Sequence, residues 1–228
     1  MKYKKPIYTI AFLLTLFILL IILISAPATI KIDGSISRFI YDSLDNDVIT
    51  QIFLLITNYT IGTVYGALAV ALFLFIKKLY THTIVFLGFG ISSFLIVSLI
   101  KNIIRRERPY EILSNVHYLS SKLPHELSFP SGHTTLAFFI AFYLTHALKL
   151  DAFKTTLIYS LAVVVGISRI YLGAHFFFDV LGGALLGTII GIISITLYNR
   201  YFTETSGVDE FDSLKMKLNK IIQSKSQN

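Results

Sequence analysis

Long apolar segments recur along this 228-residue chain and restrict its fold more than any other feature. A helix of about 20 apolar residues crosses the hydrocarbon core of a bilayer. Six such segments are predicted to be membrane-spanning helices: 7–26, 53–76, 83–100, 133–148, 155–172 and 176–198. The fourth is the weakest, because it is short and contains Thr145 and His146. We therefore expect an all-α, polytopic membrane protein, with residues 1–200 as one membrane domain and residues 201–228 as a cytoplasmic basic tail.

The composition agrees with a membrane protein and excludes several other classes. Hydrophobic residues make up 54% of the chain and charged residues only 14%, which is typical of polytopic membrane proteins. The net charge of +7 predicts no nucleic-acid partner, because the basic residues are scattered among apolar segments and form no basic, aromatic-rich surface. The absence of cysteine excludes a disulfide, a thiol nucleophile and a cysteine-ligated metal. The lipid bilayer is the expected partner, and the oligomeric state is not predicted.

Two shorter segments have the amphipathic pattern of helices that lie on a membrane surface. The first lies between the first two predicted spans, with Asp33 as its possible cap, and carries apolar residues at helical spacing: Ile32, Ile36, Phe39, Ile40 and Leu44. The second lies in the tail, for which a disordered segment is the alternative; its stripe contains Val208, Phe211, Leu214, Leu218 and Ile221. In the sixth predicted span, Gly183, Gly187 and Gly191 recur every four residues, and we expect this face to pack inside the protein instead of forming a dimer.

The distribution of Lys and Arg predicts the orientation in the membrane, because these residues favour the cytoplasmic side. If both termini are cytoplasmic, the cytoplasmic side carries a modest excess of Lys and Arg. This count leaves out the candidate site residues Lys101, Arg108 and Arg169. We therefore expect a protein of the cytoplasmic membrane with cytoplasmic termini. Three polar clusters then lie on the outer face: 101–109, 130–133 and 168–179.

Ionisable residues in or beside membrane spans are costly and therefore indicate a functional site. His175 and Asp179 lie four residues apart, so on a helix the carboxylate can accept a hydrogen bond from one imidazole nitrogen and leave the other free to react. Such a histidine can serve as a base, a metal ligand or a nucleophile. For these two residues alone, a purely structural pair is an equal alternative.

Three cations are predicted to bind an anion beside this histidine: Lys101, Arg108 and Arg169. Gly173 can turn the chain so that the last of these approaches His175. Arginine in particular binds phosphate oxygens in a bidentate manner. Arg105 and Arg106 are expected to face solvent or lipid headgroups.

The segment 130–133, with the sequence PSGH, supplies the remaining groups. Ser131 is expected to cap the fourth helix and to donate to an anion, while Gly132 permits close approach to the backbone. His133, in the first turn, can protonate a leaving oxygen as a general acid. Taken alone, this segment can equally be a helix cap.

A metal site on these residues is not expected, and no cofactor is predicted. His175 and Asp179 can ligate a cation, but the adjacent positive charges would repel it, and no third carboxylate or cysteine lies nearby in the sequence. In the loop before residue 130, Glu126 is a candidate for substrate selection or proton transfer, with a solvated loop residue as the alternative.

Together, the motifs KxxxxxxRP, PSGH and SRxxxxxHxxxD resemble the three-part signature of the type 2 phosphatidic acid phosphatase superfamily. Here they comprise Lys101, Arg108 and Pro109, then residues 130–133, then Ser168, Arg169, His175 and Asp179. The resemblance covers roughly residues 1–200. It implies a metal-free reaction in which His175, oriented by Asp179, forms a phosphohistidine, while His133 protonates the leaving group and then helps to activate water. It also implies that the phosphoryl oxygens are bound by Lys101, Arg108, Ser131, Gly132 and Arg169.

We therefore expect an integral membrane lipid phosphatase that removes the terminal phosphate of a lipid phosphate or diphosphate at the outer leaflet. Among the substrates of the family, undecaprenyl diphosphate and phosphatidylglycerophosphate are favoured, and phosphatidic acid is a further candidate. Two other functions would use the same residues: phosphotransfer to a lipid or sugar hydroxyl, and translocation of an anion or lipid without catalysis. Vanadium haloperoxidases resemble the signature too, but halide oxidation in a membrane is not expected.

Overall fold

The computed structural model describes residues 4–44, 46–57, 65–113, 119 and 127–203. Within these ranges every regular element is helical, so the predicted all-α class is confirmed. The elements are α1 Lys4–Ile24, α2 Pro27–Leu44, α3 Asp47–Thr57, α4 Gly66–Ile76, α5 Tyr80–Ile104, α6 Pro109–Ile112, α7 Gly132–Ala147, α8 Ala152–Tyr171, α9 Phe177–Tyr198 and a short π-helix, Asn199–Thr203. The expected tail helix and Glu126 fall outside the described residues.

Four stretches of the described chain are both long enough and apolar enough to cross a membrane: Pro6–Ile24, Tyr80–Ile112, Ala152–Tyr171 and Phe177–Phe202. They correspond to the first, third, fifth and sixth predicted spans, and the count of six is not confirmed. The second predicted span is described as two helices of 11 residues each, α3 and α4. A helix of that length extends only about 16 Å, which is too short to cross the bilayer core alone.

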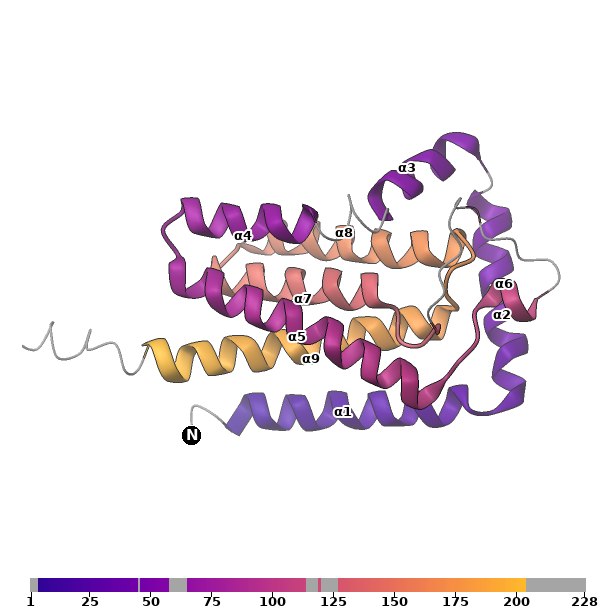
Figure 1. Ribbon diagram of the computed structural model, residues 1–228, viewed down its shortest axis with the longest axis horizontal. Coiled ribbons are helices and arrows are strands. Elements are labelled where there is room, and N and C mark those ends of the chain that lie inside the picture. The colour runs from indigo at the N-terminus through magenta and orange to yellow at the C-terminus, as the bar shows by residue number, and fades with distance from the viewer. Residues whose placement is uncertain (1–3, 45, 58–64, 114–118, 120–126, 204–228) are drawn as a thin grey trace, which may run out of the picture.

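The fourth predicted span is α7, a helix of 16 residues in the middle of the bundle. It packs against α5, α8 and α9, which run beside it (Figure 1). Its Phe139 and Tyr143 are fully buried. Phe139 stacks on Phe86 of α5, and the ring of Tyr143 packs against Phe86 in a tilted arrangement. The short helix is therefore enclosed by longer neighbours.

The close approach of α7 and α9 depends on the three glycines predicted to form a packing face. A Cβ at Gly183 would lie 2.6 Å from the carbonyl oxygen of Ser131, and one at Gly187 would overlap the carbonyl oxygen of Thr135. Non-bonded carbon atoms normally stay about 3.5–4.0 Å apart. Only glycine therefore permits this packing, and the expected internal role of the face is confirmed.

Helix α2 lies across one end of the bundle (Figure 1). The prediction that Asp33 caps a surface helix is wrong, because α2 begins at Pro27 and Asp33 lies inside it. One face of α2 is buried and carries polar residues at intervals of four: Thr29, Asp33 and Ser37. Another face carries Phe39, which is 72% exposed. Asp33 therefore points into the protein, toward the end of the bundle where the three polar clusters meet.

Candidate active site

His175 lies in the turn that joins α8 to α9. After α8 ends at Tyr171, Gly173 adopts a φ of 72°, a left-handed conformation that favours glycine. The backbone N–H groups of Ala174 and His175 both donate to the carbonyl oxygen of Arg169, at 3.1 Å. The turn therefore brings His175 back to the end of α8, as the position of Gly173 predicts.

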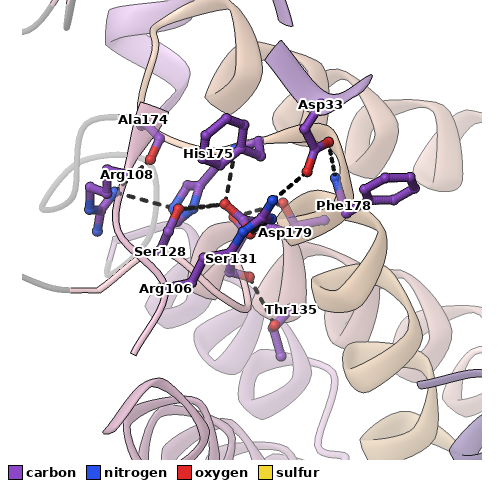
Figure 2. A network of polar contacts seen from close by, with 12 residues as sticks. Asp33, Arg106, Arg108, Ser128, Ser131, Thr135, Ala174, His175, Phe178 and Asp179 are labelled. Carbon is purple, nitrogen blue, oxygen red and sulfur yellow. Dashed lines mark hydrogen bonds and ion pairs between the residues drawn. The ribbon is translucent and has the colours of Figure 1, made fainter. Parts of the chain in front are cut away.

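The imidazole of His175 lies between a carboxylate and a guanidinium (Figure 2). Its Nδ1 is 3.5 Å from Asp179 Oδ2, and its Nε2 is 3.5 Å from Arg108 Nη1. Because a guanidinium can only donate, Nε2 is the acceptor and Nδ1 carries the proton that faces the carboxylate. Both distances are long for hydrogen bonds. A lone pair on Nε2 thus points toward a cation that can hold a phosphate.

His175 is neutral in this environment. Its side chain is only 2% exposed. Burial first, and the positive charge of Arg108 second, lower the pKa of His175 from 6.5 to about 3, although Asp179 opposes the shift. At neutral pH the imidazole can therefore act as a nucleophile.

The three predicted phosphate-binding cations are all buried at this end of the bundle. Exposed fractions are 6% for Lys101, 2% for Arg108 and 5% for Arg169. Arg108 Nη1 donates to the carbonyl oxygen of Ala174 at 2.8 Å, and the charge of Arg169 acts on His175. Lys101 lies in the last turn of α5. The positive charges of Arg108 and Arg169 beside a neutral imidazole favour a phosphate ligand.

The segment 130–133 joins the site through its backbone. The N–H of Ser131 donates to the carbonyl oxygen of Asp179 at 3.0 Å. Ser131 occupies the N-cap position of α7 as predicted, but its side chain makes no capping hydrogen bond; its hydroxyl accepts from the Thr134 hydroxyl at 3.0 Å. Gly132 and His133 form the first turn of α7, so these predicted residues begin the helix that packs on α9.

Ser128 is not among the predicted site residues, although it contacts both members of the histidine–aspartate pair. Its buried hydroxyl donates to Asp179 Oδ2 and lies 3.5 Å from His175 Nδ1. Its N–H donates to the carbonyl oxygen of Arg106 at 2.7 Å. The only sequence signal for Ser128 is its position just before the segment 130–133.

The prediction that Arg106 faces solvent or headgroups is wrong. Its side chain is 8% exposed and donates to Asp179 Oδ1 and to Asp33 Oδ2, both at 2.6 Å. Helix α5 ends at Ile104, and Arg105 adopts a left-handed φ of 53° with an exposed side chain, as expected for Arg105 itself. The break turns the following residue inward, which helical spacing alone could not predict.

The sequence of this chain matches a known protein family. A family model described as the PAP2 superfamily matches residues 81–202, a range that includes every site residue named above except Asp33. The chain belongs to the PAP2 superfamily. The family predicted from the three motifs is therefore confirmed, and PAP2 phosphatases are hydrolases that act on lipid phosphates.

Two relatives of this PAP2 chain come from Bacillus subtilis. Phosphatidylglycerophosphatase B is 35% identical over 124 residues, which are 51% of this chain and 57% of that protein, so the match spans little more than half of the relative. Undecaprenyl-diphosphatase BcrC is 30% identical over 151 residues, which are 65% of this chain and 74% of that protein.

A solved PAP2 structure has the same architecture. It is the crystal structure of a transmembrane PAP2 type phosphatidylglycerolphosphate phosphatase from Bacillus subtilis. The TM-score is 0.69 at 25% identity, and the alignment covers 85% of this chain and 98% of that one.

Proposed function

We propose that this PAP2 protein removes the terminal phosphate of a lipid phosphate or diphosphate through a phosphohistidine at His175. The position of the imidazole supports this best, because Nδ1 faces the Asp179 carboxylate and Nε2 faces the Arg108 guanidinium. A phosphate held by Arg108 would present its phosphorus to the reactive nitrogen.

The reaction takes two steps. Nε2 of His175 attacks phosphorus, the bond to the leaving lipid oxygen breaks, and His133 gives that oxygen a proton. Water then attacks the phosphohistidine, His133 takes its proton, and the N–P bond breaks to restore the neutral imidazole. Asp179 stabilises the positive ring between the steps. No metal enters, because the phosphoryl oxygens are held by Lys101, Arg108, Arg169, Ser131 and the N–H of Gly132.

These residues recognise the phosphate group and do not determine which lipid carries it. Undecaprenyl diphosphate and phosphatidylglycerophosphate are the first substrates to test, since they correspond to the names of the relatives. Phosphatidic acid is the third. With both termini in the cytoplasm, the site opens toward the outer leaflet.

The distribution of buried charge supports catalysis over translocation of an anion or lipid. A conducting path would place cations at several depths in the membrane. In the described part of the chain, the buried Lys and Arg side chains lie instead at or beyond the ends of α5 and α8 that meet at the site: Lys101, Arg106, Arg108 and Arg169.

Phosphate release from the three lipids, measured under one detergent condition with a chelator present, tests the proposal. We expect release from at least one lipid and its loss in His175→Ala. No release from any of them, or full activity in His175→Ala, would contradict the mechanism. Adding a lipid or sugar hydroxyl acceptor separates hydrolysis from phosphotransfer, because a transferase would form a phosphorylated acceptor in place of inorganic phosphate.

A further inference from the structure

Arg106 connects three distant parts of the chain next to His175 (Figure 2). Its guanidinium donates to Asp179 in α9 and to Asp33 in α2, at 2.6 Å each, and packs 4.4 Å over the ring of Phe176. Its carbonyl oxygen accepts the N–H of Ser128 at 2.7 Å. We call the three side chains Asp33, Arg106 and Asp179 the carboxylate bridge.

Arg106 fixes the carboxylate that orients the imidazole. Oδ1 of Asp179 accepts from Arg106, while Oδ2 accepts from the Ser128 hydroxyl and from the N–H of Phe176, the latter at 2.9 Å. With both oxygens held, the carboxylate cannot rotate, and Oδ2 stays directed toward Nδ1 of His175. Among the described residues, Arg106 forms ion pairs with Asp33 and Asp179, so its effect on His175 passes through Asp179.

Asp33 completes the charge balance of the carboxylate bridge. Arg106 alone would neutralise Asp179, whereas two carboxylates around one guanidinium leave one net negative charge. That charge favours the positive imidazole ring formed during phosphoryl transfer. Oδ1 of Asp33 also accepts the N–H of Phe178 at 3.1 Å, which ties α2 to the first turn of α9.

We propose that Arg106 and Asp33 are positioning residues for phosphoryl transfer, which orient Asp179 and preserve its charge so that His175 keeps its proton on Nδ1. This inference rests on the proposed role of His175 as nucleophile. It makes α2 a part of the active site, although α2 precedes the part of the chain that the PAP2 family model matches.

Arg106→Gln tests the inference, with its exposed neighbour as a matched control. Because Arg106 contacts carboxylates and the phosphate is held elsewhere, we expect kcat to fall about 10- to 100-fold, as when other groups that orient a functional histidine are removed, with KM changed less than about twofold. Arg105→Gln should leave both constants near wild type. Arg108→Gln should raise KM, because Arg108 contacts the phosphate.

Asp33→Asn provides a second variant that keeps the shape of the side chain and removes one charge. We expect a smaller fall in kcat, again with little change in KM. Since both residues act through Asp179, the double variant Asp33→Asn with Arg106→Gln should lose no more kcat than Arg106→Gln alone. If Arg106→Gln does not fold, the kcat of Asp33→Asn tests the inference instead.

The inference would be overturned by a wild-type kcat in Arg106→Gln or in Asp33→Asn. It would also be overturned if Arg106→Gln raised KM as much as Arg108→Gln does. A third contradicting result would be a fall in kcat in the double variant equal to the product of the two single falls. His175→Ala, assayed in parallel, separates this failure from a wrong proposed function. If His175→Ala is inactive while Arg106→Gln is normal, only the positioning role fails. An active His175→Ala would remove the proposed nucleophile as well.

Discussion

At the scale of single residues, the proposed reactivity of His175 depends on one negatively charged and one positively charged neighbour. Asp179 faces Nδ1 and Arg108 faces Nε2, each at 3.5 Å. Loss of the nucleophile in His175→Ala should lower kcat at least about 1,000-fold. Asp179→Asn, which favours the wrong tautomer, should lower it about 100- to 10,000-fold. Phosphate release gives kcat, and an unchanged unfolding temperature shows that each variant is folded; a folded His175→Ala that keeps a substantial share of the activity would refute the assignment.

The pKa of His175 gives a second prediction at this scale. Burial and Arg108 lower it from 6.5 to about 3, so nitrogen NMR of labelled histidine should show a neutral ring from about pH 8 to pH 5. Because the folded pKa lies below the unfolded one, the unfolded chain binds more protons, and the contribution of His175 to stability falls as the pH drops below 6.5. Arg108→Gln should raise the pKa. Titration of wild-type His175 near 6.5 would contradict the buried, cation-flanked site.

Some of these residues could be predicted and others could not. The spacing of His175 and Asp179 predicts a pair on one face of a helix. The two side chains do meet, although His175 lies in the turn before α9 and only Asp179 lies in the helix. Three other residues reach the site from elsewhere: Asp33 from α2, and Arg106 and Ser128 from segments between helices. No spacing in the sequence relates them to Asp179. Their contacts depend on how distant segments pack.

At the scale of elements, the contact between α7 and α9 is the most sensitive to added volume. A methyl group at Gly187 would overlap the carbonyl oxygen of Thr135, whereas one at Gly88 in α5 meets nothing within 4 Å. Gly187→Ala should therefore lose about 1–3 kcal/mol of stability, as overpacked interiors do, while Gly88→Ala should stay near wild type. Thermal unfolding in detergent compares the two. Equal stability would show that the helices are not packed this closely.

The sequence predicts the existence of the long apolar helices better than the bounds of the shorter ones. An unbroken apolar run indicates a membrane helix, because the bilayer penalises polar groups along its whole depth. The run 53–76 predicts a helix that begins at residue 53, whereas α3 already begins at Asp47 and ends at Thr57, and α4 begins at Gly66. Apolar content alone does not determine the residues at which a helix begins and ends.

At the scale of the whole molecule, the predicted orientation can be tested directly because the chain has no cysteine. Ser35 in α2 is exposed at the active-site end, and Lys154 at the start of α8 has a 63% exposed side chain. A membrane-impermeant maleimide should label Ser35→Cys in intact cells, and Lys154→Cys only after permeabilisation. The reverse pattern would place the active site on the cytoplasmic side.

The passage of the phosphate through His175 is tested most directly by the stereochemistry at phosphorus. The wild-type protein would be given a lipid that carries a chiral, isotopically labelled thiophosphate, and the configuration of the released thiophosphate would be determined. Each in-line transfer inverts phosphorus, so transfer first to Nε2 and then to water predicts net retention. Net inversion would show direct attack by water and would contradict a phosphohistidine intermediate.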